Sequence, residues 1–263
     1  MKDVQNLADE RGIAIQKVGV SEVHLPFLIK TKSGSFQSVL ANIKLTVDLP
    51  QEYKGTHMSR FIEVLTHWSQ KPFSNKEMSF VLDDIIYRLD AKRANMDIAF
   101  KYFIQKTAPL SGMKSLLDYN CQFSGSLIRG EHPDFTLGLS VPFTSLCPCS
   151  KEISAYGAHN QRGLMRVKIK YKPGKFIWIE DLAALMEGQG SAPVYSLLKR
   201  EDEKYLTEQA YENPKFVEDV LRDLVLVLRD LPGVAWFEVE CENYESIHNH
   251  SAYAAHVESV DTG

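Results

Sequence analysis

The stretch SFQSVLANIKLTVDLP, residues 35–50, sets the first constraint on the fold. Apolar side chains recur at alternate positions from Val39 to Val47, and polar residues such as Asn42 and Lys44 stand between them. This period of two is typical of a β-strand with one solvated face. Pro50 ends the pattern, because proline has no N–H to donate to a strand ladder. The stretch therefore predicts a long strand.

The rest of the chain repeats one order of elements. Apolar spacing of three and four predicts a helical pair between residues 56 and 93, and further helices in 177–188 and 213–233. Alternating patterns in 96–106, 115–128, 134–146, 163–174 and 234–245 predict strands. We interpret the chain as strand, strand, helix, helix, strand, strand, followed by approximately the same order again from about residue 134. We expect an α+β fold of two similar modules with antiparallel sheets, residues 1–130 and 131–263.

Length and composition exclude several classes of protein. The chain has 263 residues, is 44% hydrophobic and carries a formal net charge of −4, so a large core and no general attraction to nucleic acid are expected. No apolar run approaches about 18 residues, and the charged N-terminus lacks the apolar core of a signal peptide. Four cysteines are too few for a disulfide framework. We expect a cytoplasmic protein that binds neither nucleic acid nor membrane.

The segment SLCPCSKEISAYGAHNQR, residues 145–162, carries the first chemical signal. Cys147 stands where a predicted strand meets a loop, and His159 follows within the same segment. The two supply two of the three protein ligands that a catalytic metal site needs. The local spacing alone favours buried thiols beside an exposed histidine, because free cysteine is among the most buried residue types. Whether Cys149 shares a face with Cys147 stays open.

Two later segments concentrate further titratable groups. ENYESIHNHSAYAAH, residues 242–256, holds His248 and His250 with Glu245 nearby, a density that indicates a site; the alternative is a polar strand end with surface histidines. The acidic segment at 197–219 contains Glu203 and Glu218. Most of its carboxylates are expected on a solvated helix face, and one or two point inward to a metal or to a guanine-like ring edge.

These segments together resemble a known enzyme family. TSLCPCSKEIS, GAHNQRG, LLKREDEKYLTEQAYENPKFVED and ESIHNHSAYA are similar to motifs of the type IB GTP cyclohydrolases, the metal-dependent first enzymes of bacterial folate synthesis. YKGTHMSRF, KTAPLSG and SLLDY extend the likeness over almost the whole chain. The resemblance implies a tunnelling fold, in which ββααββ modules assemble into barrels. It also implies a homotetramer with active sites at subunit interfaces.

The resemblance assigns roles to three metal ligands. Cys147, His159 and Glu203 fall on the positions that hold a divalent ion in the family. A mixed thiolate, imidazole and carboxylate set suits Zn²⁺, Mn²⁺ or Fe²⁺. The implied reaction opens the imidazole ring of GTP at C8 with metal-activated water, releases formate and gives 7,8-dihydroneopterin triphosphate for tetrahydrofolate synthesis. An ion with one open position makes water a nucleophile near neutral pH.

The resemblance also implies which residues bind the substrate and transfer protons. Glu218 falls on the carboxylate that anchors the guanine edge, and His248 and His250 fall on the catalytic histidines, which move protons as C–N bonds break. We include Cys147 and Glu245 among the catalytic residues. Cations must neutralise the triphosphate, and Lys54, Arg60 and Arg162 are predicted to do so. Further candidates are His57, Lys106 and Lys151.

Two other functions remain open from the sequence. One is a tunnelling-fold nitrile oxidoreductase of queuosine synthesis, in which Cys147 attacks the substrate and NADPH supplies hydride. The other is an oligomer that binds pterin or purine without catalysis. The set of His159, Glu203, His248 and His250 argues against the oxidoreductase, because its nucleophilic thiolate must be unligated. The presence of every expected ligand argues against the binding protein.

Overall fold

The computed structural model describes residues 5 and 8–260. The chain divides into two compact units, unit 1 (Met1–Lys101 and Cys121–Leu137) and unit 2 (Tyr102–Asn120 and Gly138–Gly263). Three strands contribute to both units: β4 (Arg93–Thr107), β5 (Lys114–Ile128) and β6 (Asp134–Leu146). The division therefore crosses the chain at three places. The repeat boundary after residue 130 stays a prediction.

Unit 1 contains the strand predicted over residues 35–50. That stretch forms β2 (Phe36–Leu49), which pairs antiparallel with β1 (Ile15–Lys30) and with β4. The short β3 (Pro72–Phe73) adds to β1 in parallel. Val39, Ala41, Ile43, Leu45 and Val47 of β2 are all buried, at most 5% exposed. The period-two pattern is thus confirmed, with its apolar face in the core.

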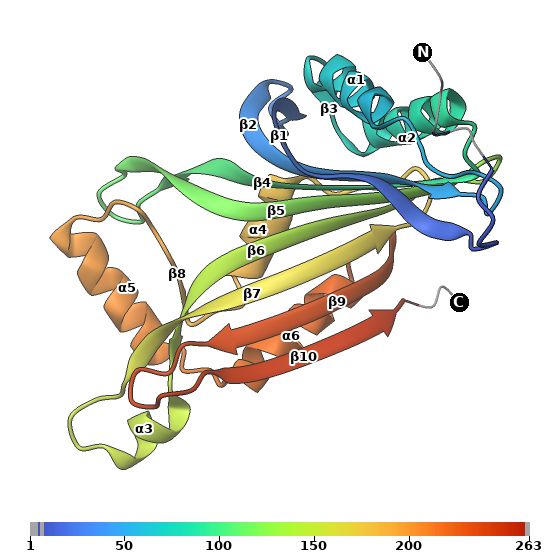
Figure 1. The fold of residues 1–263 in the computed structure, drawn as a ribbon. Helices are drawn as coiled ribbons and strands as arrows, with labels where there is room; N and C mark the ends of the chain where they lie inside the picture. Colours follow the sequence, from blue (N-terminus) through green and yellow to red (C-terminus); the bar gives the residue numbers. More distant parts are fainter. Residues whose placement is uncertain (1–4, 6–7, 261–263) are drawn as a thin grey trace. The chain divides into compact units, whose positions relative to one another are not determined.

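The predicted helical pair is also present in unit 1. It consists of α1 (Met58–Ser69) and α2 (Asn75–Leu89), which pack on each other, while α1 also packs on β1 (Figure 1). In α1, Phe61, Val64 and Leu65 are buried, so one stripe of the helix faces the core. Asp90 ends α2 in the left-handed conformation, where its N–H reaches carbonyls of the last turn.

Unit 2 holds the remaining strands and helices. Besides its parts of β4, β5 and β6, these are α3 (Pro148–Ile153), β7 (Asn160–Tyr171), α4 (Ile179–Glu187), β8 (Ala192–Pro193), α5 (Arg200–Glu212), α6 (Val217–Arg229), β9 (Val234–Asn243) and β10 (Ala252–Ser259). The strand order includes β10-β9-β7-β6, and β8 pairs with β6. Helix α6 packs on β9 and β10 (Figure 1). The chain is therefore α+β, as predicted.

Gly163 allows close packing at the start of β7. A Cβ atom there would lie 2.5 Å from the Phe143 ring and 2.7 Å from Asn243 Oδ1. Phe143 and Asn243 are both buried, so neither can move away easily. The absence of a side chain at Gly163 thus lets β6, β7 and β9 pack together just behind the predicted site.

A buried ion pair joins β4 to α4 within unit 2. Lys106 Nζ donates to Glu187 Oε1 and to the Val194 carbonyl, each at 2.8 Å, and lies 4.1 Å from the centre of the Tyr195 ring. The Tyr119 hydroxyl donates to the same Glu187 oxygen at 2.5 Å. Burial lowers the pKa of Lys106 more than Glu187 raises it. Lys106, a candidate for binding phosphate, is instead engaged in the interior.

No helix among residues 5 and 8–260 has the length and apolar character needed to cross a membrane.

Candidate active site

Cys147 begins the short helix that follows β6. It is the N-cap of α3, and its Sγ accepts a hydrogen bond from Ser150 N at 3.4 Å. Pro148 occupies the first turn, where its missing N–H costs nothing. Cys147 is half-buried, whereas Cys149 is exposed. The turn at Pro148 thus gives the two thiols different surroundings, a point that the sequence left open.

His159 lies beside Cys147 through backbone contacts. Cys147 N donates to the His159 carbonyl at 3.1 Å, and His159 N donates to Ser150 Oγ at 3.1 Å. His159 Nδ1 lies 2.9 Å from Gln161 Oε1, an acceptor, which places the ring proton on Nδ1. The Nε2 lone pair is then available to a metal ion, the arrangement common among metal-binding histidines.

Glu203 lines a cavity next to this segment. It is exposed in the first turn of α5 and borders a cavity of about 260 Å³, together with Asn160, Arg162 and Tyr195. Asn160 also borders a second cavity of about 310 Å³, which Leu146 lines as well. The chain neighbours of both Cys147 and His159 therefore face cavities in the region of Glu203.

The three side chains offer a suitable donor set, but they are not gathered around one point. Within the described part of the chain, no group of three or more His, Cys, Asp or Glu side chains lies close enough to hold a metal ion. Sulfur, imidazole nitrogen and carboxylate oxygen suit the divalent ions named above. The backbone contact brings Cys147 and His159 together, while Glu203 lines a cavity that Asn160, the residue after His159, also borders. The metal set stays a prediction that fits the donors present.

The predicted catalytic histidines occupy the turn between β9 and β10. The rings of His248 and His250 stack with their centres 5.1 Å apart, and both side chains are exposed. Glu245 Oε1 lies 3.5 Å from Gln161 Nε2, at the limit of a hydrogen bond. Since Gln161 also contacts His159, and Ser246 Oγ lies 3.4 Å from His159 Nδ1, two side chains link this turn to the metal-ligand segment.

Glu218 lies in the first turn of α6 and is exposed. The residues before this helix are fastened to the end of β6: Lys215 N donates to the Leu146 carbonyl, and Ser145 Oγ donates to the Lys215 carbonyl, each at 3.1 Å. The start of α6 is thereby held beside the strand that delivers Cys147. Its helix dipole also favours a carboxylate at this position.

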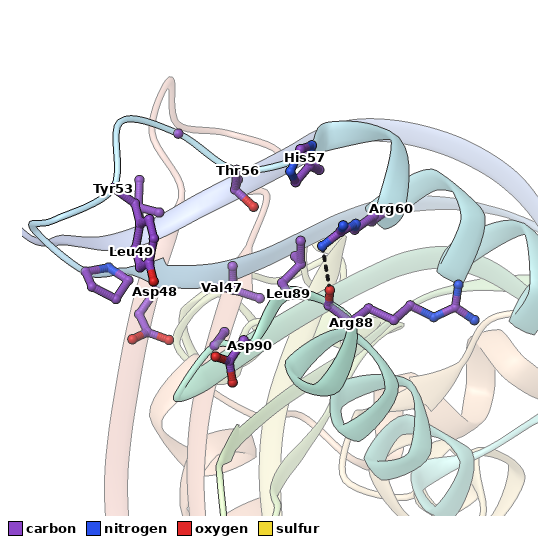
Figure 2. Close-up of a pocket in the computed structure, with 13 residues that line it drawn as sticks. Val47, Asp48, Leu49, Tyr53, Thr56, His57, Arg60, Arg88, Leu89 and Asp90 are labelled. Carbon is purple, nitrogen blue, oxygen red and sulfur yellow. Dashed lines mark hydrogen bonds between the residues drawn. The ribbon is translucent and has the colours of Figure 1, made fainter. Parts of the chain in front are cut away.

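The three predicted phosphate-binding cations lie in different places. Arg162 borders the cavity with Glu203. Arg60 borders a separate cavity of about 190 Å³ in unit 1, where its Nη1 donates to the Arg88 carbonyl at 2.8 Å (Figure 2). Lys54 is exposed; hydrogen bonds from Arg11 are the main reason that the pKa of the Asp9 carboxyl is lowered, and the charge of Lys54 adds a small part. Each unit thus holds part of the predicted cation set.

Comparison with known proteins identifies the family. The model of the type I GTP cyclohydrolase folE2 family matches residues 1–254. The chain is 54% identical over 255 residues to GTP cyclohydrolase FolE2 of Geotalea uraniireducens (strain Rf4), covering 97% of this chain and 92% of that protein. Its identity to the FolE2 of Geobacter sulfurreducens (strain ATCC 51573 / DSM 12127 / PCA) is 51%, with 97% of each chain covered.

The chain belongs to the type I GTP cyclohydrolase FolE2 family. It is therefore a GTP cyclohydrolase by family, as the sequence motifs indicated.

Solved structures support the fold of this FolE2 family member. Uricase from Arthrobacter globiformis superimposes with a TM-score of 0.51 at 7% identity, covering 93% of each chain. Urate oxidase from Bacillus sp. TB-90 gives a TM-score of 0.54 at 9% identity, with 93% of this chain and 100% of that chain covered. These urate oxidases share the tunnelling fold, so the predicted fold class is confirmed. At such low identity the likeness concerns the fold alone.

Sequence reasoning missed Gln161, which links the two halves of the candidate site. It is 8% exposed and contacts both His159 and Glu245. It stands inside the GAHNQRG motif, in which only the histidine is a typical metal ligand. Its position two residues after His159, at the start of an alternating strand, was the available signal, because i and i+2 side chains share a face.

Proposed function

We propose that this chain hydrolyses GTP at C8, releases formate and forms 7,8-dihydroneopterin triphosphate for tetrahydrofolate synthesis. What supports the proposal is the family match over residues 1–254 together with the position of the motif residues. Cys147 and His159, from different elements, are neighbours through a backbone hydrogen bond. Glu203 borders the cavity that Asn160, the next residue after His159, also lines.

In this proposal Cys147, His159 and Glu203 hold one divalent ion, Zn²⁺, Mn²⁺ or Fe²⁺. When bound, the ion supplies Lewis acidity that makes water nucleophilic near neutral pH. Gln161 holds the His159 ring so that Nε2 carries the lone pair. Its second contact, with Glu245, couples that ring to the turn that carries His248 and His250.

His248 and His250 transfer protons in the proposed reaction. Their exposed rings stand on a turn that Gln161 connects to the ligand segment, and imidazole is the side chain that most often transfers protons in general acid–base catalysis. Nitrogen atoms of the purine ring need protons as C–N bonds break, and the two histidines deliver them. Glu245 restrains the turn through Gln161.

Glu218 recognises the base. A carboxylate accepts hydrogen bonds from N1–H and the exocyclic amine of guanine, whereas adenine presents an acceptor at N1. A charge-assisted hydrogen bond of this kind contributes about 1.5–3 kcal/mol, enough for strong discrimination. Arg162, Arg60 and Lys54 neutralise the triphosphate in the proposal. We further propose a homotetramer whose barrels complete each site between subunits, acting in the cytoplasm.

The direct test combines product and metal analysis. Purified protein is stripped of metal, reloaded separately with Zn²⁺, Mn²⁺ or Fe²⁺, and incubated with GTP. Formate and a fluorescent oxidised pterin are expected in equal amounts, and strong chelation should abolish both. Absence of both products with every metal, in protein that remains folded, would refute the activity. Turnover that survives chelation would refute the role of the metal.

A further inference from the structure

Asp202 is an unusually placed carboxylate beside the predicted ligand Glu203. Its side chain is 0% exposed, although it stands in the first turn of α5 between two exposed glutamates. Four donors surround it. Leu110 N and Ser111 N each donate to Oδ1 at 2.9 Å; Ser111 Oγ donates to Oδ2 at 2.6 Å, and Lys199 N donates to Oδ2 at 2.9 Å.

These contacts join two segments far apart in the sequence. Leu110 and Ser111 belong to the loop between β4 and β5, which is itself closed by hydrogen bonds from Ala108 N to the Met113 carbonyl, at 2.9 Å, and from Gly112 N to the Ala108 carbonyl, at 3.2 Å. Lys199 is the N-cap of α5. One carboxylate therefore fastens the start of the helix to a rigid loop of the same unit.

The hydrogen bonds of Asp202 also restrain the backbone at Glu203. It follows Asp202 directly, and its own N–H donates to the Lys199 carbonyl at 3.0 Å. The backbone at Glu203 is thus held by its bond to Lys199, which Asp202 in turn fixes, and by Asp202 itself as the preceding residue. A long flexible side chain binds an ion well only from a fixed base, because less conformational entropy is then lost on binding.

We propose that Asp202 is a positioning residue: its buried carboxylate, clamped on Leu110, Ser111 and Lys199, holds the first turn of α5 so that Glu203 reaches the metal ion. The inference rests on the proposed function, in which Glu203 is a metal ligand. In the proposal Asp202 contacts neither substrate nor ion, and its effect passes entirely through Glu203.

The test is a double-mutant cycle with metal affinity as the readout. Full-length protein, freed of metal and kept in its native oligomeric state, is titrated with Co²⁺ while the visible absorption of the bound ion is followed. Glu203→Gln should weaken Co²⁺ binding strongly. Asp202→Ala should weaken it by about tenfold, the range seen when groups that orient ligands are removed. The double variant should bind no more weakly than Glu203→Gln alone.

Two further variants separate positioning from general loss of stability. Asp48→Ala is the matched control, because Asp48 Oδ1 accepts hydrogen bonds from Lys92 N and Arg93 N, at 2.9 and 2.6 Å, in unit 1; it should lower the melting temperature and leave Co²⁺ affinity unchanged. Asp202→Asn retains an oxygen for the two loop N–H groups and should bind Co²⁺ between wild type and Asp202→Ala. If Asp202→Ala does not fold, Asp202→Asn takes its place in the cycle.

Each other outcome overturns the inference in a recognisable way. If both Asp202 variants bind Co²⁺ as tightly as wild type while Glu203→Gln binds it more weakly, Asp202 has no positioning role. The assignment of Glu203 as a ligand then stands. If Asp202→Ala lowers Co²⁺ affinity by the same factor in the Glu203→Gln background as in wild type, Asp202 does not act through Glu203. If Asp48→Ala lowers Co²⁺ affinity as much as Asp202→Ala does, the effect of Asp202 on affinity is a general loss of stability. Wild-type affinity in Glu203→Gln overturns the ligand assignment, and the positioning role with it.

Discussion

Replacing Lys106 with methionine leaves one half of a buried ion pair without its partner. The side chains of Lys106 and Glu187 are only 9% and 14% exposed. Removing one member of such a pair costs about 3–5 kcal/mol, because the remaining charge stays buried. Tyr119 continues to donate to Glu187 Oε1, so we expect the lower end, about 3 kcal/mol. For a chain of this size that corresponds to a fall in melting temperature of about 6–12 °C.

The companion variant Lys106→Met/Glu187→Met should be much less damaging. Burial outweighs the attraction of Glu187 and lowers the pKa of Lys106, which indicates that desolvation of Lys106 offsets its gain from pairing with Glu187. Methionine at both positions removes both charges and keeps the volume. The loss that remains, about 1–2 kcal/mol, comes from the Tyr119 hydroxyl, which is left without this acceptor.

Urea unfolding followed by tryptophan fluorescence and circular dichroism measures all three variants, with Glu187→Met completing the cycle. The two single losses should sum to well above the loss of the double variant, a coupling of several kcal/mol. Additive losses would show that the two charges do not depend on each other in the folded state. That result would refute the argument from burial.

Three further predictions concern packing, pH and the site. Gly163→Ala should lower the free energy of unfolding by about 1–3 kcal/mol in urea titrations, because its Cβ would lie 2.5 Å from a buried ring. The pKa of Glu258 is lowered to about 2, chiefly by the Arg229 hydrogen bond. Its contribution to stability should be complete above the unfolded pKa, about 4.3, and should fade as the pH falls toward the folded value; the melting temperatures of wild type and Glu258→Gln should converge there. Cys147→Ala should abolish turnover and lower metal content by elemental analysis, whereas Glu218→Ala should keep the metal and weaken GTP binding by calorimetry.

The elements that sequence patterns predicted are those with strong, one-sided burial. Strand β2 and helices α1, α2, α4 and α6 each bury a regular set of large apolar side chains. Strand β10 was not predicted, because its alternation rests on alanines and its inner positions are only half-buried. Helix α3 has six residues and buries none of them, so it leaves no periodic signal.

The residue types of the candidate site could be predicted from the sequence, but the long-range hydrogen bonds between them could not. Cys147, His159 and Glu203 stand out because thiol, imidazole and carboxylate groups occur in motifs. The part played by Gln161 depends on the approach of the turn that holds Glu245, a long-range contact that no local pattern contains. Asp202 reads as one more acid on a charged helix face, and only the loop at 108–113 makes it a buried anchor.

The three strands that contribute to both units carry a consequence for how the polypeptide is made. Unit 1 needs residues up to Leu137, yet the ribosome has by then already released Tyr102–Asn120, which belong to unit 2. No single cut in the gene separates the two units, and a fragment ending near residue 101 lacks the returning segment of β5. We therefore expect truncated versions of this enzyme to aggregate, and nascent chains to stay unfolded until translation has passed its midpoint.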